Sequence, residues 1–185
     1  MVKAITFATT NEGKLREAAD ILGIKVVGTP LEINEIQSLD AAKVAIQKAH
    51  DYFAELTCPL IIEDVAFSFD ALKGLPGPYI SDFSKALGND GLIDLLGSKE
   101  NRRATATTTL VYVDENGTDH IFSGEMEGTI AIESKGTNGF GWDPIFIPKG
   151  ETRTLAEMEL GDKNRYSMRA KTFSKLKSWL QSQEG

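Results

Sequence analysis

The sequence predicts an α/β protein with a mixed β-sheet flanked by helices, built as one domain with two lobes. In the first half of the chain, amphipathic helical segments alternate with short apolar runs that are typical of buried strands. In the second half, runs rich in threonine and β-branched residues are separated by turn sequences, which is the pattern of antiparallel strands. The length of 185 residues fits one domain, so we expect residues 1–185 to form a single two-lobed domain.

The first elements alternate between strand and helix. Ala4–Ala8 is an apolar run that indicates a buried strand, and the apolar face of the following segment predicts a helix that stops near Gly23. Val26-Val27 indicates a second strand. Ser38 is the expected N-cap of a long helix that extends to Leu56.

The middle of the chain changes from a strand to a turn and short helices. Leu60–Ile62 indicates a buried strand that ends at Glu63-Asp64. Gly74–Pro78 is rich in glycine and proline and predicts a rigid turn. Two short helices are expected between Tyr79 and Leu96.

The last third is expected to hold the antiparallel strands. Ala104–Val113 indicates a strand, and Asn116-Gly117 predicts the turn of a hairpin. Thr129–Ile132 indicates another strand, and Gly136–Pro144 is a long glycine-rich loop. The apolar positions within residues 172–180 share one side of a final helix.

The net charge of −7 argues against some partners. A negative surface repels a phosphate backbone, so we expect no nucleic-acid partner. A small anion remains a possible ligand where a few cations gather. No apolar run reaches the ~20 residues needed to cross a bilayer, so we expect no membrane partner.

The expected compartment is the cytoplasm. Met1–Ile5 leads directly into a strand-like run, which argues against a signal peptide. The chain has one cysteine, Cys58, which makes no intrachain disulfide and suits a reducing environment.

The first candidate site is the polar turn Thr9–Lys14 between a strand and a helix. Backbone N–H groups at a helix start attract anions, and hydroxyl, amide and ammonium donors would add to that attraction. The spacing does not match a P-loop. A capped helix with a solvated lysine explains the same residues, so both interpretations remain open.

The second candidate is Glu63-Asp64, expected at the end of a buried strand. Ligand clefts form at strand ends in open α/β sheets, and carboxylates there suit Mg²⁺. Glu35 is a candidate second ligand. A turn or helix cap is the alternative explanation for the acidic pair. His50 and His120 stand far apart without partners at ligand spacing, which argues against a histidine metal site.

The third candidate is Phe140-Gly141-Trp142-Asp143, followed by Pro144. Glycines let a flat ligand approach the backbone, aromatic rings stack on a base, and an aspartate accepts from ring N–H groups. An ordinary turn with core aromatics is the alternative. Lys163 and Arg169 flank the start of the last helix and read as surface charge when taken alone.

Taken together and in order, these segments resemble the inosine triphosphate pyrophosphatase family, also called the Ham1 family. The resemblance spans nearly the whole chain, and the blocks Gly74–Tyr79 and Phe140–Pro144 are its most specific parts. The matching segments are Ala8–Lys14, Glu35–Gln37, Glu63-Asp64, Ala71–Tyr79, Phe140–Pro144, Ala156–Met158, Lys163-Asn164 and Ser167-Met168-Arg169.

The resemblance implies an elongated fold with two lobes around a central active-site cleft, and a homodimer. It implies a hydrolase that cleaves ITP, dITP and XTP to the monophosphate and pyrophosphate with Mg²⁺. Glu35 and Asp64 would hold the metal, and Asp64 would also act as the general base for the attacking water.

The resemblance also implies which residues bind the substrate. Thr9, Thr10, Asn11, Glu12, Gly13 and Lys14 would hold the triphosphate. Phe140, Gly141, Trp142 and Asp143 would hold the base, and Lys163 and Arg169 would complete the contacts.

Two positions depart from the family pattern. Met168 stands where the family usually has histidine in a Ser-His-Arg motif, and Val65 stands where it usually has serine or threonine. Both fall at positions that would contact the substrate, so a hydrogen bond that selects the base is expected to be missing. An unpaired polar group of this kind costs about 1–3 kcal/mol.

These departures leave two alternatives open. In one, the same fold and hydrolysis act on a different nucleobase. In the other, the chain binds a nucleotide and has lost catalysis. Retention of Glu35, Asp64, Lys14 and Lys163 argues against the second alternative.

Overall fold

The computed structural model describes residues 3–183. Met1 and Val2, which belong to the expected N-terminal run, lie outside the described residues, as do residues 184–185. The strands pair in the order β2-β1-β3-β5-β6-β7, with β4 paired to β3. Strand β1 pairs in parallel with β2 and β3, whereas the β3–β4 and β6–β7 pairs are antiparallel. The predicted α/β fold with a mixed sheet is therefore confirmed.

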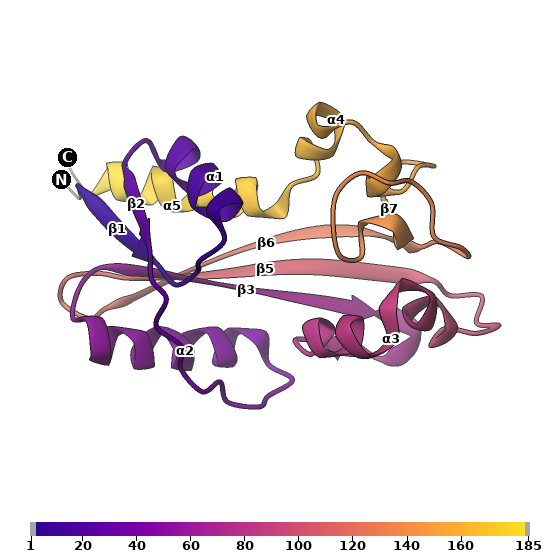
Figure 1. Ribbon diagram of the computed structural model, residues 1–185, viewed down its shortest axis with the longest axis horizontal. Coiled ribbons are helices and arrows are strands. Elements are labelled where there is room, and N and C mark those ends of the chain that lie inside the picture. Colours follow the sequence, from indigo (N-terminus) through magenta and orange to yellow (C-terminus); the bar gives the residue numbers. More distant parts are fainter. Residues whose placement is uncertain (1–2, 184–185) are drawn as a thin grey trace. The chain divides into compact units, whose positions relative to one another are not determined.

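The elements follow one another as the sequence order dictates (Figure 1). The strands are β1 (Ala4–Phe7), β2 (Lys25–Gly28), β3 (Leu60–Phe69), β4 (Pro76–Gly77), β5 (Arg103–Val113), β6 (Asp119–Ile130) and β7 (Phe146–Pro148). The α-helices are α1 (Glu12–Leu22), α2 (Ala41–Leu56), α3 (Ile80–Asp94), α4 (Leu160–Asn164) and α5 (Met168–Ser182). Short 3₁₀ turns are η1 (Asp70–Leu72), η2 (Asp143–Ile145) and η3 (Leu155–Glu157). Among the helices of residues 3–183, none combines the length and apolar character needed to cross a membrane.

The described chain divides into two compact units. Unit 1 contains residues 3–64, 108–124 and 169–183, and unit 2 contains residues 65–107 and 125–168. Strands β3, β5 and β6 each contribute residues to both units.

Unit 1 buries both faces of its strands. Helices α1 and α5 lie on one side of these strands and α2 lies on the other (Figure 1). Ile61 packs in the cluster that includes residues of α1 and α5, whereas Leu60 and Ile62 pack in the cluster that includes residues of α2. Successive strand residues point to opposite faces, so β3 supplies both clusters in turn.

The caps of the two long helices of unit 1 differ in how well the sequence predicts them. Helix α1 ends at Gly23, as expected, because Gly23 adopts a left-handed conformation that suits glycine. Helix α2 begins after Asp40, whose side chain accepts hydrogen bonds from the N–H groups of Ala42 and Lys43. The prediction of Ser38 as the N-cap was wrong, because Ser38 instead accepts from the N–H of Asp40, outside the helix.

Strand β3 is longer than the sequence indicated. It was expected to end at Glu63-Asp64, but it continues to Phe69 and is ten residues long. The residues after the acidic pair are mostly apolar or aromatic, and Ala66, Phe67 and Phe69 are buried. The acidic pair therefore lies within a strand, and the strand-end argument for a ligand cleft does not apply to it.

Unit 2 is built around one apolar core. Phe67 and Phe69 of β3, Leu92 of α3 and Phe146 of β7 are buried there. Helix α3 contains a kink at Gly88, where the backbone leaves the helical conformation, so the two short helices expected in this region are joined end to end. Thr129 belongs to the end of β6, which corrects the expectation of a separate strand at Thr129–Ile132.

The hairpin of β5 and β6 is closed by one aspartate. Asp114 accepts hydrogen bonds from the N–H groups of Asn116 (2.8 Å) and Thr118 (3.0 Å), and His120 lies 3.1 Å from its second oxygen. Burial acts to raise the pKa of Asp114, but these hydrogen bonds outweigh it, and the pKa lies below its ordinary value.

We expect Asp114→Ala to lower the free energy of unfolding by about 1–2 kcal/mol at neutral pH, because the turn loses its acceptor. A lowered folded-state pKa stabilises the fold above the unfolded-state pKa, and this contribution is lost as the pH falls through the folded-state pKa. The difference between wild type and variant should therefore shrink in acid. Urea unfolding from neutral to acidic pH measures it, with the neighbouring Glu115→Ala as control. A difference that grows in acid would contradict this account.

Candidate functional site

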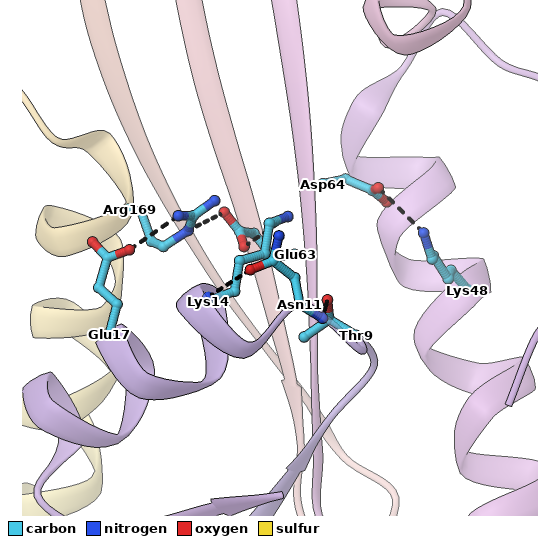
Figure 2. A network of polar contacts seen from close by, with 8 residues as sticks. All are labelled: Thr9, Asn11, Lys14, Glu17, Lys48, Glu63, Asp64 and Arg169. Carbon is cyan, nitrogen blue, oxygen red and sulfur yellow. Dashed lines mark hydrogen bonds and ion pairs between the residues drawn. The ribbon is translucent and has the colours of Figure 1, made fainter. Parts of the chain in front are cut away.

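Two adjacent carboxylates of β3 face opposite sides of the sheet in unit 1 (Figure 2). Glu63 points toward Lys14 of α1 and Arg169 of α5, and Asp64 points toward Lys48 of α2. This arrangement follows from the two-residue period of a strand. The acidic pair therefore serves two separate clusters.

The Glu63 cluster joins three elements. Arg169 Nε donates to Glu63 Oε1 at 2.7 Å, and Arg169 Nη1 donates to Glu17 Oε2 at 3.0 Å. Lys14 Nζ lies 3.5 Å from Glu63 Oε2, which receives no hydrogen bond within the described part of the chain. The Glu63 side chain has no exposed surface, whereas the Lys14 side chain is 31% exposed. Lys14 therefore keeps access to solvent while its charge is held in place.

Arg169 is a fixed cation. Burial acts to lower its pKa, but the charge of Glu63 and the hydrogen bonds to Glu63 and Glu17 outweigh burial, so the pKa is raised. The planar guanidinium with several donors is suited to carboxylate and phosphate oxygens. Lys14 and Arg169 thus place two positive groups on the same side of β3.

The Asp64 cluster lies on the α2 side. The Lys48 ammonium donates a hydrogen bond to Glu35 and lies 3.4 Å from Asp64 Oδ1. Burial raises the pKa of Asp64; the Lys48 charge opposes this effect, and the nearby charge of Glu35 adds to it. Asp64 is therefore a stronger base than an ordinary aspartate.

Glu35 and Asp64 fit a hard divalent cation. Both contact the same ammonium, so their carboxylates lie around one position of positive charge. Asp64 Oδ2 is buried and has no hydrogen-bond partner within residues 3–183, so it has an acceptor oxygen to offer. No group of three or more Asp, Glu, His or Cys side chains in the described chain is placed to hold a metal. A donor set of two carboxylates is typical of Mg²⁺, which keeps waters and binds phosphates with its remaining positions.

The polar turn before α1 is an exposed, capped helix start. Asn11 Oδ1 accepts from the N–H of Lys14, and Thr9 Oγ1 accepts from the N–H of Asn11. The side chains between and around them are exposed: Thr10, Asn11, Glu12 and Gly13. The capping role left open by the sequence is thus present, and the turn carries Lys14 into the Glu63 cluster.

Unit 2 holds the third candidate group. Asp143 is 4% exposed, and its Oδ2 accepts from the N–H of Phe140 at 2.7 Å and from Lys163 Nζ at 2.5 Å. Lys163 Nζ lies 4.8 Å from the centre of the Phe140 ring, which is 71% exposed. Asp143 therefore holds an ammonium beside an exposed aromatic face, and Gly141 lies in the same exposed loop.

The other expected substrate contacts of unit 2 pack in its core. Trp142 stacks on Phe67 with ring centres 4.4 Å apart. Met168 is 9% exposed and belongs to the apolar cluster, and Val65 packs against that cluster. These side chains contribute packing, whatever further contacts they make.

Sequence reasoning missed Lys48 and Glu17. Lys48 lies on α2 four residues from Val44 and four from Tyr52, both buried. A lysine that interrupts an apolar helix stripe is a signal for a buried charge partner, because buried charges are paired. Glu17 lies on α1 and gave no comparable signal.

Comparisons with known proteins place this arrangement in context. A sequence model described as the Ham1 family matches residues 5–179. The chain is 40% identical to an inosine triphosphate pyrophosphatase of Kluyveromyces lactis, with 95% of each chain covered. It is 38% identical to a dITP/XTP pyrophosphatase of Methanopyrus kandleri, with 96% of each covered. The structure of the Staphylococcus aureus Ham1 protein is similar, with a TM-score of 0.88 and 26% identity over 98% of this chain and 100% of that one.

The buried Glu63 network predicts a large effect on stability. Glu63→Ala should lower the free energy of unfolding by about 3–5 kcal/mol, because it leaves the Arg169 charge without its buried partner. Urea unfolding followed by circular dichroism measures this change. Glu127→Ala is the matched control, since Glu127 forms an exposed ion pair with Lys149 and its loss should matter little. Equal effects of the two substitutions would refute the buried role of Glu63.

Proposed function

Because this chain belongs to the Ham1 family, we propose that it hydrolyses nucleoside triphosphates with non-standard purine bases to the monophosphate and pyrophosphate. ITP, dITP and XTP are the proposed substrates, in line with the names of the relatives. The observation that carries the proposal is the pair Glu35 and Asp64 around one position of positive charge in unit 1.

Asp64 and Glu35 are the proposed ligands of Mg²⁺, and Asp64 is the proposed general base. A bound Mg²⁺ supplies neutralisation of charge on phosphate oxygens, which phosphoryl transfer requires. Asp64 takes a proton from a water molecule whose oxygen attacks the α-phosphorus. The bond from that phosphorus to the bridging oxygen of the β-phosphate breaks, and pyrophosphate leaves. The raised pKa of Asp64 supports the role of base.

The exposed helix start and the cations of unit 1 are the proposed triphosphate-binding groups. The residues from Thr9 to Lys14 offer the N–H groups of a helix start, which attract anions. Lys14 and Arg169 supply positive charge, and Glu63 keeps both in position. Binding the anion at its oxygens leaves Asp64 to act on water.

The Phe140 loop of unit 2 is the proposed site for the base. Stacking on the exposed Phe140 ring would hold any purine, since every base has a flat face. Lys163 is only a donor, so it suits a carbonyl oxygen on the ring. Gly141 leaves the loop open at this point, and Trp142 and Asp143 support the loop from beneath.

A shifted base preference is a second candidate function. Met168 occupies the position where the family usually has histidine, and it is packed in the core of unit 2. A thioether in this position donates no hydrogen bond to a base. Selection among keto purines and ordinary purines would then depend on Lys163 and on backbone groups.

We further propose a cytoplasmic homodimer that is one functional domain and needs no nucleic-acid or membrane partner. The net charge of −7 supports the absence of a nucleic-acid partner. Sedimentation of the purified protein at several concentrations tests the dimer.

A panel of triphosphates tests the proposed reaction. With Mg²⁺ present, ITP, dITP and XTP should yield equal amounts of monophosphate and pyrophosphate, and removal of Mg²⁺ with EDTA should abolish the products. Chromatography of the nucleotides together with a pyrophosphate assay measures both products. Faster turnover of ATP or GTP would favour the shifted base preference, release of inorganic phosphate alone would rule out the proposed cleavage, and binding without products would indicate lost catalysis.

Asp64→Asn tests the proposed base. It should lower kcat on ITP by about 10²–10⁴-fold, because the amide cannot accept the proton from water. Circular dichroism should show a folded variant. Asp70→Asn, which changes a carboxylate in an exposed ion pair with Arg103, is the matched control and should retain activity. Near-normal turnover by Asp64→Asn would remove Asp64 from the mechanism.

A further inference from the structure

One ammonium occupies the position that the two proposed metal ligands share. Lys48 donates to Glu35 and lies 3.4 Å from Asp64 Oδ1. The three residues come from three segments of unit 1: the loop before α2, α2 itself and β3. The side chain of Lys48 is 15% exposed and that of Asp64 is 22% exposed, so solvent screens this group only in part.

The contacts of Lys48 leave its partners in a defined state. Asp64 uses Oδ1 for Lys48, and its buried Oδ2 has no hydrogen-bond partner within the described residues. The ammonium offsets one of two negative charges that would otherwise repel each other. It therefore holds the two carboxylates near one another without any metal.

From this geometry we infer that Lys48 is an internal counter-ion that competes with the divalent metal for Glu35 and Asp64. This inference rests on the proposed metal site. Mg²⁺ binds carboxylate oxygens at about 2.0–2.1 Å, so it and the ammonium cannot occupy the same position between these oxygens. Repulsion between the two cations also disfavours an ammonium that stays beside the bound metal.

The consequence is that metal binding requires exchange of Lys48. The ammonium must leave the shared position, and the work of breaking its two contacts is subtracted from the affinity for the metal. The protein without nucleotide therefore binds metal weakly, and its metal site stays assembled by Lys48. An anionic substrate offers the displaced ammonium a new partner, which couples metal binding to substrate binding.

Direct measurement of metal binding tests the exchange. Full-length protein, stripped of metal with EDTA and free of nucleotide, is titrated with Mn²⁺ and followed by calorimetry and by the electron paramagnetic resonance of free Mn²⁺. Lys48→Met should bind Mn²⁺ about tenfold more tightly than wild type, because one partly screened like charge is gone. Lys43→Met removes the same charge from an exposed position on the same helix and should leave the affinity unchanged.

A second substitution locates the effect. The gain from Lys48→Met should disappear when Glu35→Gln is added, since the gain belongs to the shared carboxylates. Affinity of Lys48→Met that is equal to or lower than that of wild type would overturn the inference, and so would a gain that survives Glu35→Gln. Lys48→Arg keeps the charge and should not produce the gain.

A measurement on the wild type keeps the test valid if Lys48→Met does not fold. Nuclear magnetic resonance of ¹³Cε-labelled lysine, with Lys48 assigned through Lys48→Arg, reports the surroundings of the ammonium. Its signal should move as Mg²⁺ is added, and an unmoved signal at saturating Mg²⁺ would overturn the exchange. If ITP hydrolysis depends on Asp64 while these tests fail, only the exchange is wrong. If ITP is not hydrolysed, the failure lies with the proposed function.

Discussion

The two-residue period of β3 is the constraint from which the arrangement of unit 1 follows. Neighbouring side chains on a strand must point to opposite faces, so Glu63 and Asp64 cannot share a cluster. Helices α1 and α5 supply cations to the first and α2 supplies a cation to the second. The same alternation places Ile61 in one apolar cluster and Leu60 and Ile62 in the other, so packing and chemistry use the same pattern.

The two clusters differ in what they can offer a ligand. Glu63 is enclosed and balanced by Arg169 and Lys14, so it supports cations instead of meeting solvent. Asp64 keeps one oxygen unpartnered and its basicity is raised by burial. Burial of a charge is costly unless a partner is present. The division of labour between support and reactivity therefore follows from how completely each carboxylate is paired.

The sequence predicted the elements whose signal is local. The apolar periodicity of α1 and the glycine at its end were sufficient for that helix, and Asn116-Gly117 marked the hairpin. The end of β3 was misplaced because charged residues usually close a buried strand, and the partners that keep Glu63 inside come from distant segments. Helix α4 was missed because five residues are too few to show periodicity.

The sequence reached the candidate site in the same uneven way. Asp64, Glu35 and Lys14 were chosen by residue type and by the family resemblance, and their assembly around cations needed the fold. Lys48 was overlooked because a lysine on a helix usually faces solvent. Its partners are a loop residue thirteen positions earlier and a strand residue sixteen positions later, and no local pattern announces such a meeting.

The crowding around Gly139 limits how the loop beside it can change during evolution. A Cβ at this position would lie 2.2 Å from Asp143 Oδ2 and 2.9 Å from Lys163 Nζ, and the backbone has a φ of +80°. Any side chain here would be strained and would push apart a carboxylate and the lysine that it holds. Descendants of this chain can therefore diversify at exposed neighbours such as Phe140 one substitution at a time, but a change at Gly139 would have to be preceded by rearrangement of its surroundings.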